Sequence, residues 1–200
     1  MMWFMPSLIP STVPPGRLRR SAQPSIGVSD ELSLRPWSPA DAPAVVEAFE
    51  DPTIQRWHGR HAASEDEARE WIAGWGEEWE RETAAHWAIV RTGNREVLGR
   101  ISLRDLDLFF GQAECAYWIL PGARGSGVAG RAVTAVAGWA FGEAGFHRLE
   151  IMHSVANTAS CRVAAKAGFA WEGTKRSAGP HADGWHDMHL HARITSDERR

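Results

Sequence analysis

Residues 124–130 have the composition of a turn that could bind phosphate. They read Arg-Gly-Ser-Gly-Val-Ala-Gly, between an apolar run that ends at Leu120 and a long run of small residues that we expect to be helical. The first N–H groups of a helix have no partner within it, and glycines before it let the backbone curl around an anion. The alternative is a tight turn that only lets the helix pack closely. The residues predicted to contact the anion are Arg124, Gly125, Ser126, Gly127, Val128, Ala129 and Gly130.

Three polar residues near this turn could take part in proton transfer or ligand binding. Glu114 lies on the predicted strand that leads into the turn, and its carboxylate could accept a proton from an amine. Asn157 and Ser160 open a predicted helix further along the chain. Each has a structural alternative, because a carboxylate can simply pair with an arginine, and Asn and Ser are common helix caps.

The chain resembles the GCN5-related (GNAT) N-acetyltransferases, in the RimJ/RimL-like branch. The turn matches the family's Q/R-x-x-G-x-G/A loop through Arg124, Gly127 and Ala129. The segments NTASCRVAAKAGF and WEGTKR resemble the branch's N-x-x-S…K-x-G-F and E-G-x-x-R signatures, and Asp187 stands where its last strand usually has an aspartate. The resemblance runs from about Glu31 to Ile194, with its motifs in the family's order.

The resemblance implies an α/β fold, in which a mixed sheet with two parted central strands is flanked by helices. It also implies acetyl-CoA as the cofactor. The pyrophosphate would bind residues 124–130, and the pantetheine arm would pair with the main chain of Trp118, Ile119 and Leu120. The implied reaction is direct transfer of the acetyl group to a primary amine in a ternary complex. The alternative is a catalytically silent CoA-binding module that acts as a sensor or partner protein.

The resemblance also implies roles for individual residues. Asn157 would contact the pantetheine amides, and the Ser160 hydroxyl would protonate the leaving thiolate. We expect Ser160 in the place of the tyrosine that many GNAT enzymes use, because Tyr117, the one tyrosine, lies on the predicted strand. Glu114 is the candidate base, and a backbone N–H near Ile119 is the candidate donor to the carbonyl oxygen.

The resemblance also implies that the first two helices wall the acceptor site, so residues 64–82 are expected to form one wall of it. They combine many acidic side chains with Trp71, Trp75 and Trp79, which recur every four residues on one helix face. Such a wall would suit a cationic amine. The alternative is an ordinary amphipathic helix with its tryptophans inward. The acceptor itself stays open between a protein N-terminus and a small-molecule amine.

The C-terminal segment is rich in potential metal ligands, but we expect no metal. Successive strand residues point to opposite faces, so His186 and Asp187 cannot converge on one ion. Cys161, beside Ser160, receives no catalytic role. The group considered is His181, Asp183, His186, Asp187, His189 and His191.

Bulk properties limit the partners. The formal net charge of −3 argues against nucleic acid, and no run is long enough to span a membrane. Two cysteines are too few for a disulfide framework, which favours a cytoplasmic location. We expect the protein to be a monomer or a homodimer. We divide the chain into a proline-rich arm (1–30), one catalytic domain (31–195) and a short tail (196–200).

The patterns predict these elements in order. Strands are expected at 31–37, 86–92, 95–105, 114–120, 146–154, 170–176 and 185–194, and helices at 38–51, 64–83, 127–144 and 158–169.

Overall fold

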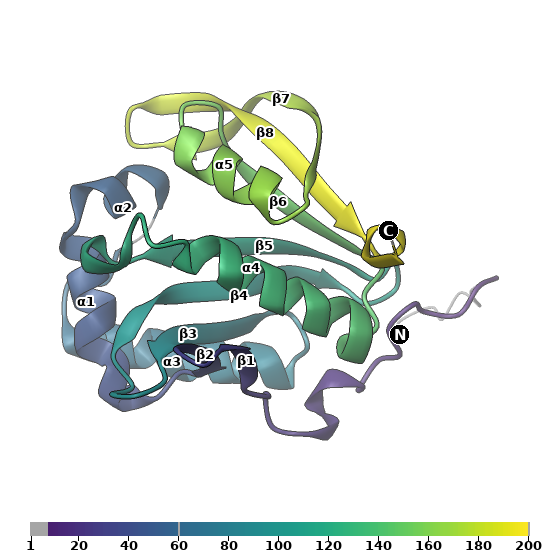
Figure 1. Ribbon diagram of the computed structural model, residues 1–200, viewed down its shortest axis with the longest axis horizontal. Coiled ribbons are helices and arrows are strands. Elements are labelled where there is room, and N and C mark those ends of the chain that lie inside the picture. Colours follow the sequence, from purple (N-terminus) through teal and green to yellow (C-terminus); the bar gives the residue numbers. More distant parts are fainter. Residues whose placement is uncertain (1–7, 60, 200) are drawn as a thin grey trace, which may run out of the picture.

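One sheet of eight strands organises the protein (Figure 1). The computed structural model describes residues 8–59 and 61–199. The strand order is β1-β2-β3-β4-β5-β6-β8-β7, and all neighbours are antiparallel except β5 and β6. This confirms the predicted mixed α/β fold. The strands are β1 (Ile26–Ser29), β2 (Leu32–Pro36), β3 (Ala85–Arg91), β4 (Val97–Asp107), β5 (Gln112–Ile119), β6 (Arg148–Ser154), β7 (Ala170–His181) and β8 (Gly184–Ile194).

Helices cover both faces of the sheet. In Figure 1, α4 and α5 lie in front of the strands, and α3 lies behind them. The helices are α1 (Ala42–Glu50), α2 (Pro52–Trp57), α3 (Glu65–Glu80), α4 (Val128–Trp139) and α5 (Thr158–Lys166). A π-helical turn, Ala140–Ala144, extends α4. Short 3₁₀ turns lie at Leu18–Arg20, Pro39–Asp41, Pro121–Ala123 and Thr195–Arg199.

Capping residues set the helix starts as the sequence predicts. Ser38 and Asp41 form a reciprocal capping box ahead of α1. At α3, the Ser64 hydroxyl accepts the Glu67 N–H at 3.2 Å, while the Glu67 carboxylate accepts from Ala63 N–H. Each bond satisfies a donor that the helix would otherwise leave unpaired.

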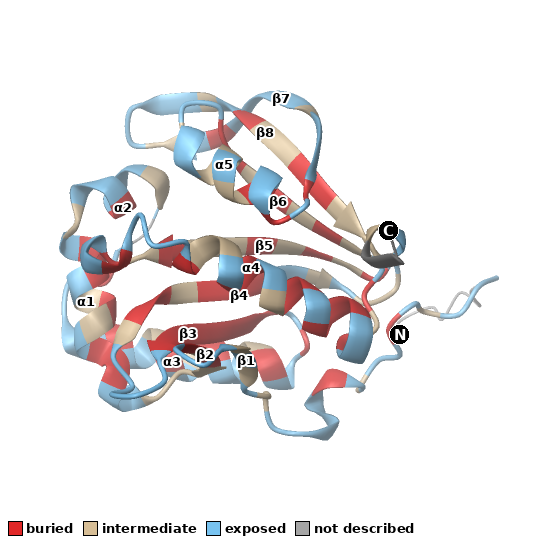
Figure 2. Ribbon diagram, in the orientation of Figure 1, coloured by how far each residue is buried: buried red, intermediate tan, exposed pale blue. Residues whose placement is uncertain are grey.

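The core forms two clusters of buried residues. Figure 2 shows buried positions along β3, β4 and the inner side of α4. The larger cluster joins α4 to the sheet through residues such as Val133, Val136 and Phe146. The smaller one packs α1 and α3 around Trp118. Trp75 and Trp79 are buried and Trp71 is half-buried, so the predicted tryptophan face of α3 points inward.

β5 and β6 are paired over only part of their length. Their parallel register joins Gln112 to Arg148, Ala113 to Leu149 and Glu114 to Glu150. Beyond Glu114, β5 continues to Ile119 beside β4 alone, and Figure 1 shows β6 rising away from it. This is the parting of the central strands that the family resemblance implies.

The described part of the predicted arm packs against the domain. Val13 and Leu18 are buried, and the buried Glu82 carboxylate accepts N–H bonds from Gly16 and Leu18 at 2.5 and 2.7 Å. Its last residues form β1, which pairs with β2. Neither β1 nor α2 is among the predicted elements, because each is short and lies beside a proline. Residues 1–7 of the predicted arm lie outside the described residues.

Among the residues that the structure describes, no helix has the length and hydrophobicity needed to cross a bilayer.

Candidate active site

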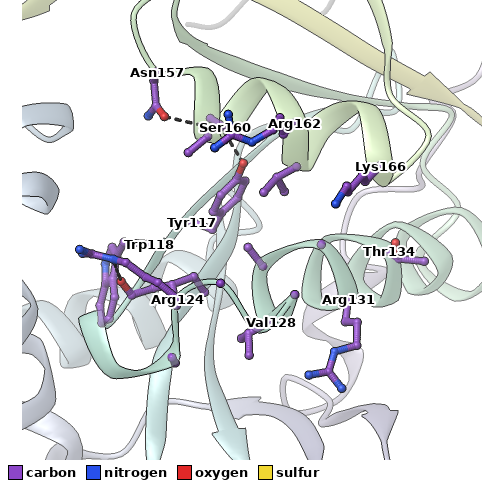
Figure 3. Close-up of a pocket in the computed structure, with 18 of the residues that line it drawn as sticks. Tyr117, Trp118, Arg124, Val128, Arg131, Thr134, Asn157, Ser160, Arg162 and Lys166 are labelled. Carbon is purple, nitrogen blue, oxygen red and sulfur yellow. Dashed lines mark hydrogen bonds between the residues drawn. The ribbon is translucent and has the colours of Figure 1, made fainter.

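A cavity of about 1050 Å³ lies where β5 and β6 part, between α4 and α5. Figure 3 shows side chains from β5, α4 and α5 pointing toward it. The structure brings together most of the residues that the sequence predicts for the cofactor. Those that line the cavity are Trp118, Ile119, Arg124, Gly125, Gly127, Val128, Ala129, Gly130, Asn157 and Ser160. Glu114, Leu120 and Ser126 are not among its lining residues.

The charged residues that line this cavity are cationic. Arg124, Arg131, Arg162 and Lys166 contribute to it, and the described lining includes no carboxylate. Figure 3 shows that they come from the turn before α4, from α4 and from α5. Such a surface favours an anionic ligand of several charges, such as a polyphosphate.

The turn before α4 needs its glycines for backbone conformation. Gly125 and Gly127 have φ values of +76° and +77°, a region that residues with a Cβ rarely adopt. A Cβ on Gly125, Gly127 or Gly130 would meet no atom within 4 Å, so close packing does not require these glycines. Gly127 is also the N-cap of α4, with no side-chain cap. The first N–H groups of α4 are therefore presented to the cavity without a competing cap.

Arg124 braces this turn. Its Nε donates to the Ile119 carbonyl oxygen at 3.1 Å, and its terminal nitrogens pair with Asp51 at 2.7 and 3.3 Å. The guanidinium holds the pKa of Asp51 below its usual range. Asp51 also caps α2 by accepting the Ile54 N–H. Arg124 therefore ties the turn to α2, and only part of its charge is left for a ligand.

The main chain at the end of β5 is free on one side only. The Leu120 N–H donates to the Leu98 carbonyl of β4 at 2.9 Å, so it is not available to a ligand. Backbone groups alternate in direction along a strand, so the Ile119 N–H points away from β4, toward the gap. By the same alternation, the Trp118 N–H points toward β4. Of the three predicted residues, Ile119 is the one whose N–H faces the cavity.

A hydrogen-bonded pair joins β5 to the start of α5. The Tyr117 hydroxyl lies 2.8 Å from Ser160 Oγ, as the dashed line in Figure 3 marks. Burial raises the pKa of Tyr117, so the phenol stays protonated. Asn157 Oδ1 caps α5 by accepting the Ser160 N–H at 3.1 Å, and its Nδ2 donor is left for a ligand. Asn157 thus caps the helix and lines the cavity at once.

Comparison with known proteins decides the family. The family model described as an acetyltransferase (GNAT) domain matches residues 31–170. The chain belongs to the GNAT acetyltransferases. The predicted activity, acetyl-CoA-dependent N-acetyl transfer, is thereby confirmed at the level of the family.

Individual relatives agree with this assignment. The chain is 28% identical over 149 residues to the uncharacterized N-acetyltransferase YoaA of Bacillus subtilis, covering 74% of this chain and 84% of YoaA. It is 27% identical to the putative ribosomal N-acetyltransferase YdaF of the same organism, covering 80% and 88%. The solved structure of RimL, a ribosomal L7/L12 α-N-protein acetyltransferase, in complex with coenzyme A has a TM-score of 0.80 at 24% identity. That match covers 86% of this chain and 98% of RimL.

Tyr117 is a site residue of this GNAT domain to which sequence reasoning gave no role. Its neighbours Cys115 and Ile119 share its face of β5, and only the fold shows that α5 closes over that face. The signal was present in the sequence, because Tyr117 stands two residues before Ile119. Ser160 was predicted, but its partner was not.

Glu114 lies on the opposite face of β5. Its carboxylate accepts from Arg104 Nη2 at 2.5 Å, and burial raises its pKa above the usual value although Arg104 opposes the shift. Arg104 lines a second cavity of the GNAT domain, and Glu114, which it contacts, is not among the residues that line that cavity. The pairing with arginine that we considered as the alternative is therefore present.

The second cavity, of about 820 Å³, lies on the α3 side of β5. His58, Tyr117 and Trp118 line both cavities, so the two meet at the end of β5. Burial lowers the pKa of His58 to about 4, which leaves its imidazole neutral near pH 7. His58 was not predicted, because a lone histidine after a short helix carries no sequence signal.

The predicted acidic wall is only partly present in the second cavity. Trp71, Trp75, Glu70 and Glu78 of α3 line it, together with Asp105. Two arginines line it too, and Arg100 stacks over the Trp75 ring at 4.8 Å. The protein's own cation thus occupies that tryptophan face.

Asp187 braces the irregular part of β7. Its Oδ1 accepts the Ser177 N–H at 2.8 Å, across the β7–β8 pair. Ser177 has a φ of +48°, so this bond holds a strained backbone position.

Proposed function

We propose that this GNAT domain binds acetyl-CoA between α4 and α5 and acetylates an N-terminal amine of a protein by direct attack in a ternary complex. One observation carries the proposal: a cationic, glycine-lined cavity meets the parted edge of β5 beside the Tyr117–Ser160 pair. When bound, acetyl-CoA supplies an acetyl group activated as a thioester. A small-molecule amine is the other acceptor class.

The residues of this chain fit the cofactor by chemistry. The N–H groups of residues 125–130 would bind the pyrophosphate, with Arg131, Arg162 and Lys166 adding positive charge. The Asn157 carboxamide and the Ile119 main chain offer donors for the pantetheine arm and the acetyl carbonyl. Trp118 and Leu120 would contribute as the buried support of this edge.

Ser160 and Tyr117 would supply the proton that the leaving CoA thiolate needs. The Ser160 hydroxyl can donate its proton to a thiolate while it accepts one from Tyr117. Because burial keeps Tyr117 protonated, this pair holds the proton ready where negative charge develops. A serine that has no such partner would be a weaker acid.

Glu114 and His58 are the two candidates for removing the amine proton. A general base works best when its pKa lies near the operating pH. Burial moves the Glu114 pKa upward, toward that range, and moves the His58 pKa to about 4, away from it. We therefore propose Glu114 as the base, acting through water in the second cavity, and His58 as a residue that positions the acceptor.

The second cavity and the names of the relatives support the proposed acceptor class. RimL is named for acetylation of a ribosomal protein N-terminus, and YdaF is named as a putative ribosomal N-acetyltransferase. An α-amine has a pKa of about 8, so it is neutral more often than a lysine amine. Glu70, Glu78 and Asp105 could hold its charged form, but Arg100 and Arg104 limit how strongly the cavity selects cations.

The test is a thiol-release screen with acetyl-CoA against N-terminal peptides, amino acids, polyamines and aminoglycosides. Release with peptides whose α-amine is free, and none with N-blocked peptides, is expected. Release only with small amines would assign the other acceptor class. Tight CoA binding by calorimetry with no release across the panel would instead indicate a silent CoA-binding module.

A cytoplasmic location is part of this proposal. Both cysteines, Cys115 and Cys161, are free thiols, which suits a reducing compartment.

A further inference from the structure

Four metal-ligand side chains converge between α5 and the strands beneath it. Cys161 lies on α5, His153 on β6, and His189 and His191 on β8. One ligand atom from each lies within 4.8 Å of all the others. The strand register explains the meeting, because His153 and His189 stand directly opposite each other and His191 follows two residues later on the same face.

The spacing is close to that of a tetrahedral metal site. Donor atoms at 2.0–2.3 Å from a zinc ion lie about 3.3–3.7 Å apart. Cys161 Sγ is already 3.8 Å from His191 Nε2. The rings of His153 and His191 stack at 5.2 Å, and those of His153 and His189 meet at 5.5 Å. Side-chain shifts of about 1 Å would bring the four donors onto one ion.

Three ring nitrogens of this group are buried and have no hydrogen-bond partner. They are His153 Nε2, His189 Nδ1 and His191 Nδ1, and the His153 residue is only 5% exposed. A buried polar atom with no partner costs free energy, and such atoms are rare in native proteins. The other nitrogen of His153, Nδ1, lies 2.8 Å from the Ser154 carbonyl oxygen and donates to it. That bond leaves the Nε2 lone pair free, as in histidines that bind metals.

We propose that His153, Cys161, His189 and His191 bind one Zn²⁺ ion as a closed, structural site. One thiolate and three neutral imidazoles are donors that a borderline-soft divalent ion prefers. Since all four positions come from the protein, no open position is left for catalysis.

The site would fasten α5 to β6 and β8. Ser160 and Asn157, which line the cofactor cavity, lie on or just before the same helix as Cys161. This site revises our expectation of no metal, which considered only C-terminal residues. Alternation did separate His186 from Asp187, and His186 instead pairs with Asp183 at 2.8 Å and stacks on His181. The missing partners, His153 and Cys161, come from other elements.

The first experiment titrates Zn²⁺ into the tag-free full chain after chelator dialysis, by calorimetry. We expect saturation at one ion per chain. Cys161→Ser and His153→Gln should each weaken binding at least tenfold, while His181→Gln, on the β7–β8 hairpin, should leave it unchanged. At a hundredfold excess over Kd, the melting temperature should rise by about 5–10 °C. Absence of saturable binding, or equal binding by all three variants, would overturn the proposal.

The second experiment needs no variant and so does not depend on one folding. Iodoacetamide labelling is mapped by mass spectrometry with Zn²⁺ or with a chelator. Zn²⁺ should slow labelling of Cys161 at least tenfold and leave the fully buried Cys115 unaffected. Co²⁺ should give a thiolate-to-cobalt charge-transfer band. Equal labelling of Cys161 in both conditions, with no such band, would show that these residues only pack together. Neither readout depends on acetyl transfer.

Discussion

The two cavities on either side of β5 meet at His58, Tyr117 and Trp118 but are built differently. The cavity at α4 offers main-chain N–H groups and four cations. The cavity at α3 is lined by side chains of both charges and by tryptophans. Backbone donors at a helix terminus need no particular side chain, so the first cavity depends mainly on the glycines that set the backbone of the turn. The second depends on particular side chains.

This difference suggests a division of labour. The backbone-built cavity suits a cofactor that every member of the family shares. The side-chain-built cavity can change with each acceptor while the sheet stays the same. The variants below test whether the two sides can be damaged separately, from the largest expected effect to the smallest.

Gly127→Val should harm the α4 cavity most. A β-branched residue at φ +77° is strained, so the turn would move and its N–H groups would leave the pyrophosphate. We expect CoA affinity to fall about a hundredfold, roughly the loss of one or two charge-assisted hydrogen bonds. Calorimetry measures this. The matched control is Gly122→Val, because Gly122 lies in the same loop at an ordinary φ with open space around it.

If Gly122→Val and Gly127→Val lowered CoA affinity equally, the positive φ of Gly127 would not be needed for CoA binding. The backbone-built account of this cavity would then be wrong.

Ser160→Ala and Tyr117→Phe should damage the point where the cavities meet. Each removes one hydroxyl of the 2.8 Å pair, so we expect kcat to fall roughly 30-fold in either variant. CoA affinity should change less than threefold, since the backbone contacts remain. Steady-state kinetics and calorimetry on the same preparations separate the two effects. A defect in CoA binding alone would make the pair a positioning device.

Glu114→Gln should lower kcat at least tenfold and leave CoA binding intact. Because burial raises the Glu114 pKa, its carboxylate is protonated as the pH falls, at a higher pH than a free glutamate. The wild-type rate should therefore have an acidic limb above pH 4.5 that Glu114→Gln abolishes. His58→Gln is the comparison. A larger loss of kcat in His58→Gln, with the acidic limb retained in Glu114→Gln, would assign the base to His58.

The sequence predicted the lining residues of the α4 cavity better than those of the α3 cavity. Glycines, a helix start and the Asn157–Ser160 spacing are local patterns, and the fold placed nearly all of them around one cavity. Ser64 caps α3 as predicted, because a cap is formed by neighbours in sequence. Ser38 is also a cap, but it caps the 3₁₀ turn Pro39–Asp41, and α1 itself begins at Ala42.

The rest depended on contacts between distant segments. Tyr117 meets Ser160 across 43 residues, and Arg100 reaches the Trp75 ring from another element. No local pattern reports such contacts. The acidic composition of α3 therefore overstated the charge of the second cavity, because the arginines of β4 that offset it come later in the chain.

Lys166→Ala tests the smallest difference between the cavities, their response to salt. Lys166 lines the α4 cavity at the end of α5, and an exposed charge contributes about 0.2–1 kcal/mol. CoA affinity should fall about threefold in low salt, and the gap should close at 0.5 M salt because screening weakens exposed charges. Lys175→Ala, on exposed β7, is the control.

In Glu70→Gln, which alters the α3 cavity, the KM for a peptide should rise about twofold in low salt with CoA affinity unchanged. If both substitutions changed both ligands alike, the charges would act through the whole surface, and the two cavities would not be electrostatically separate.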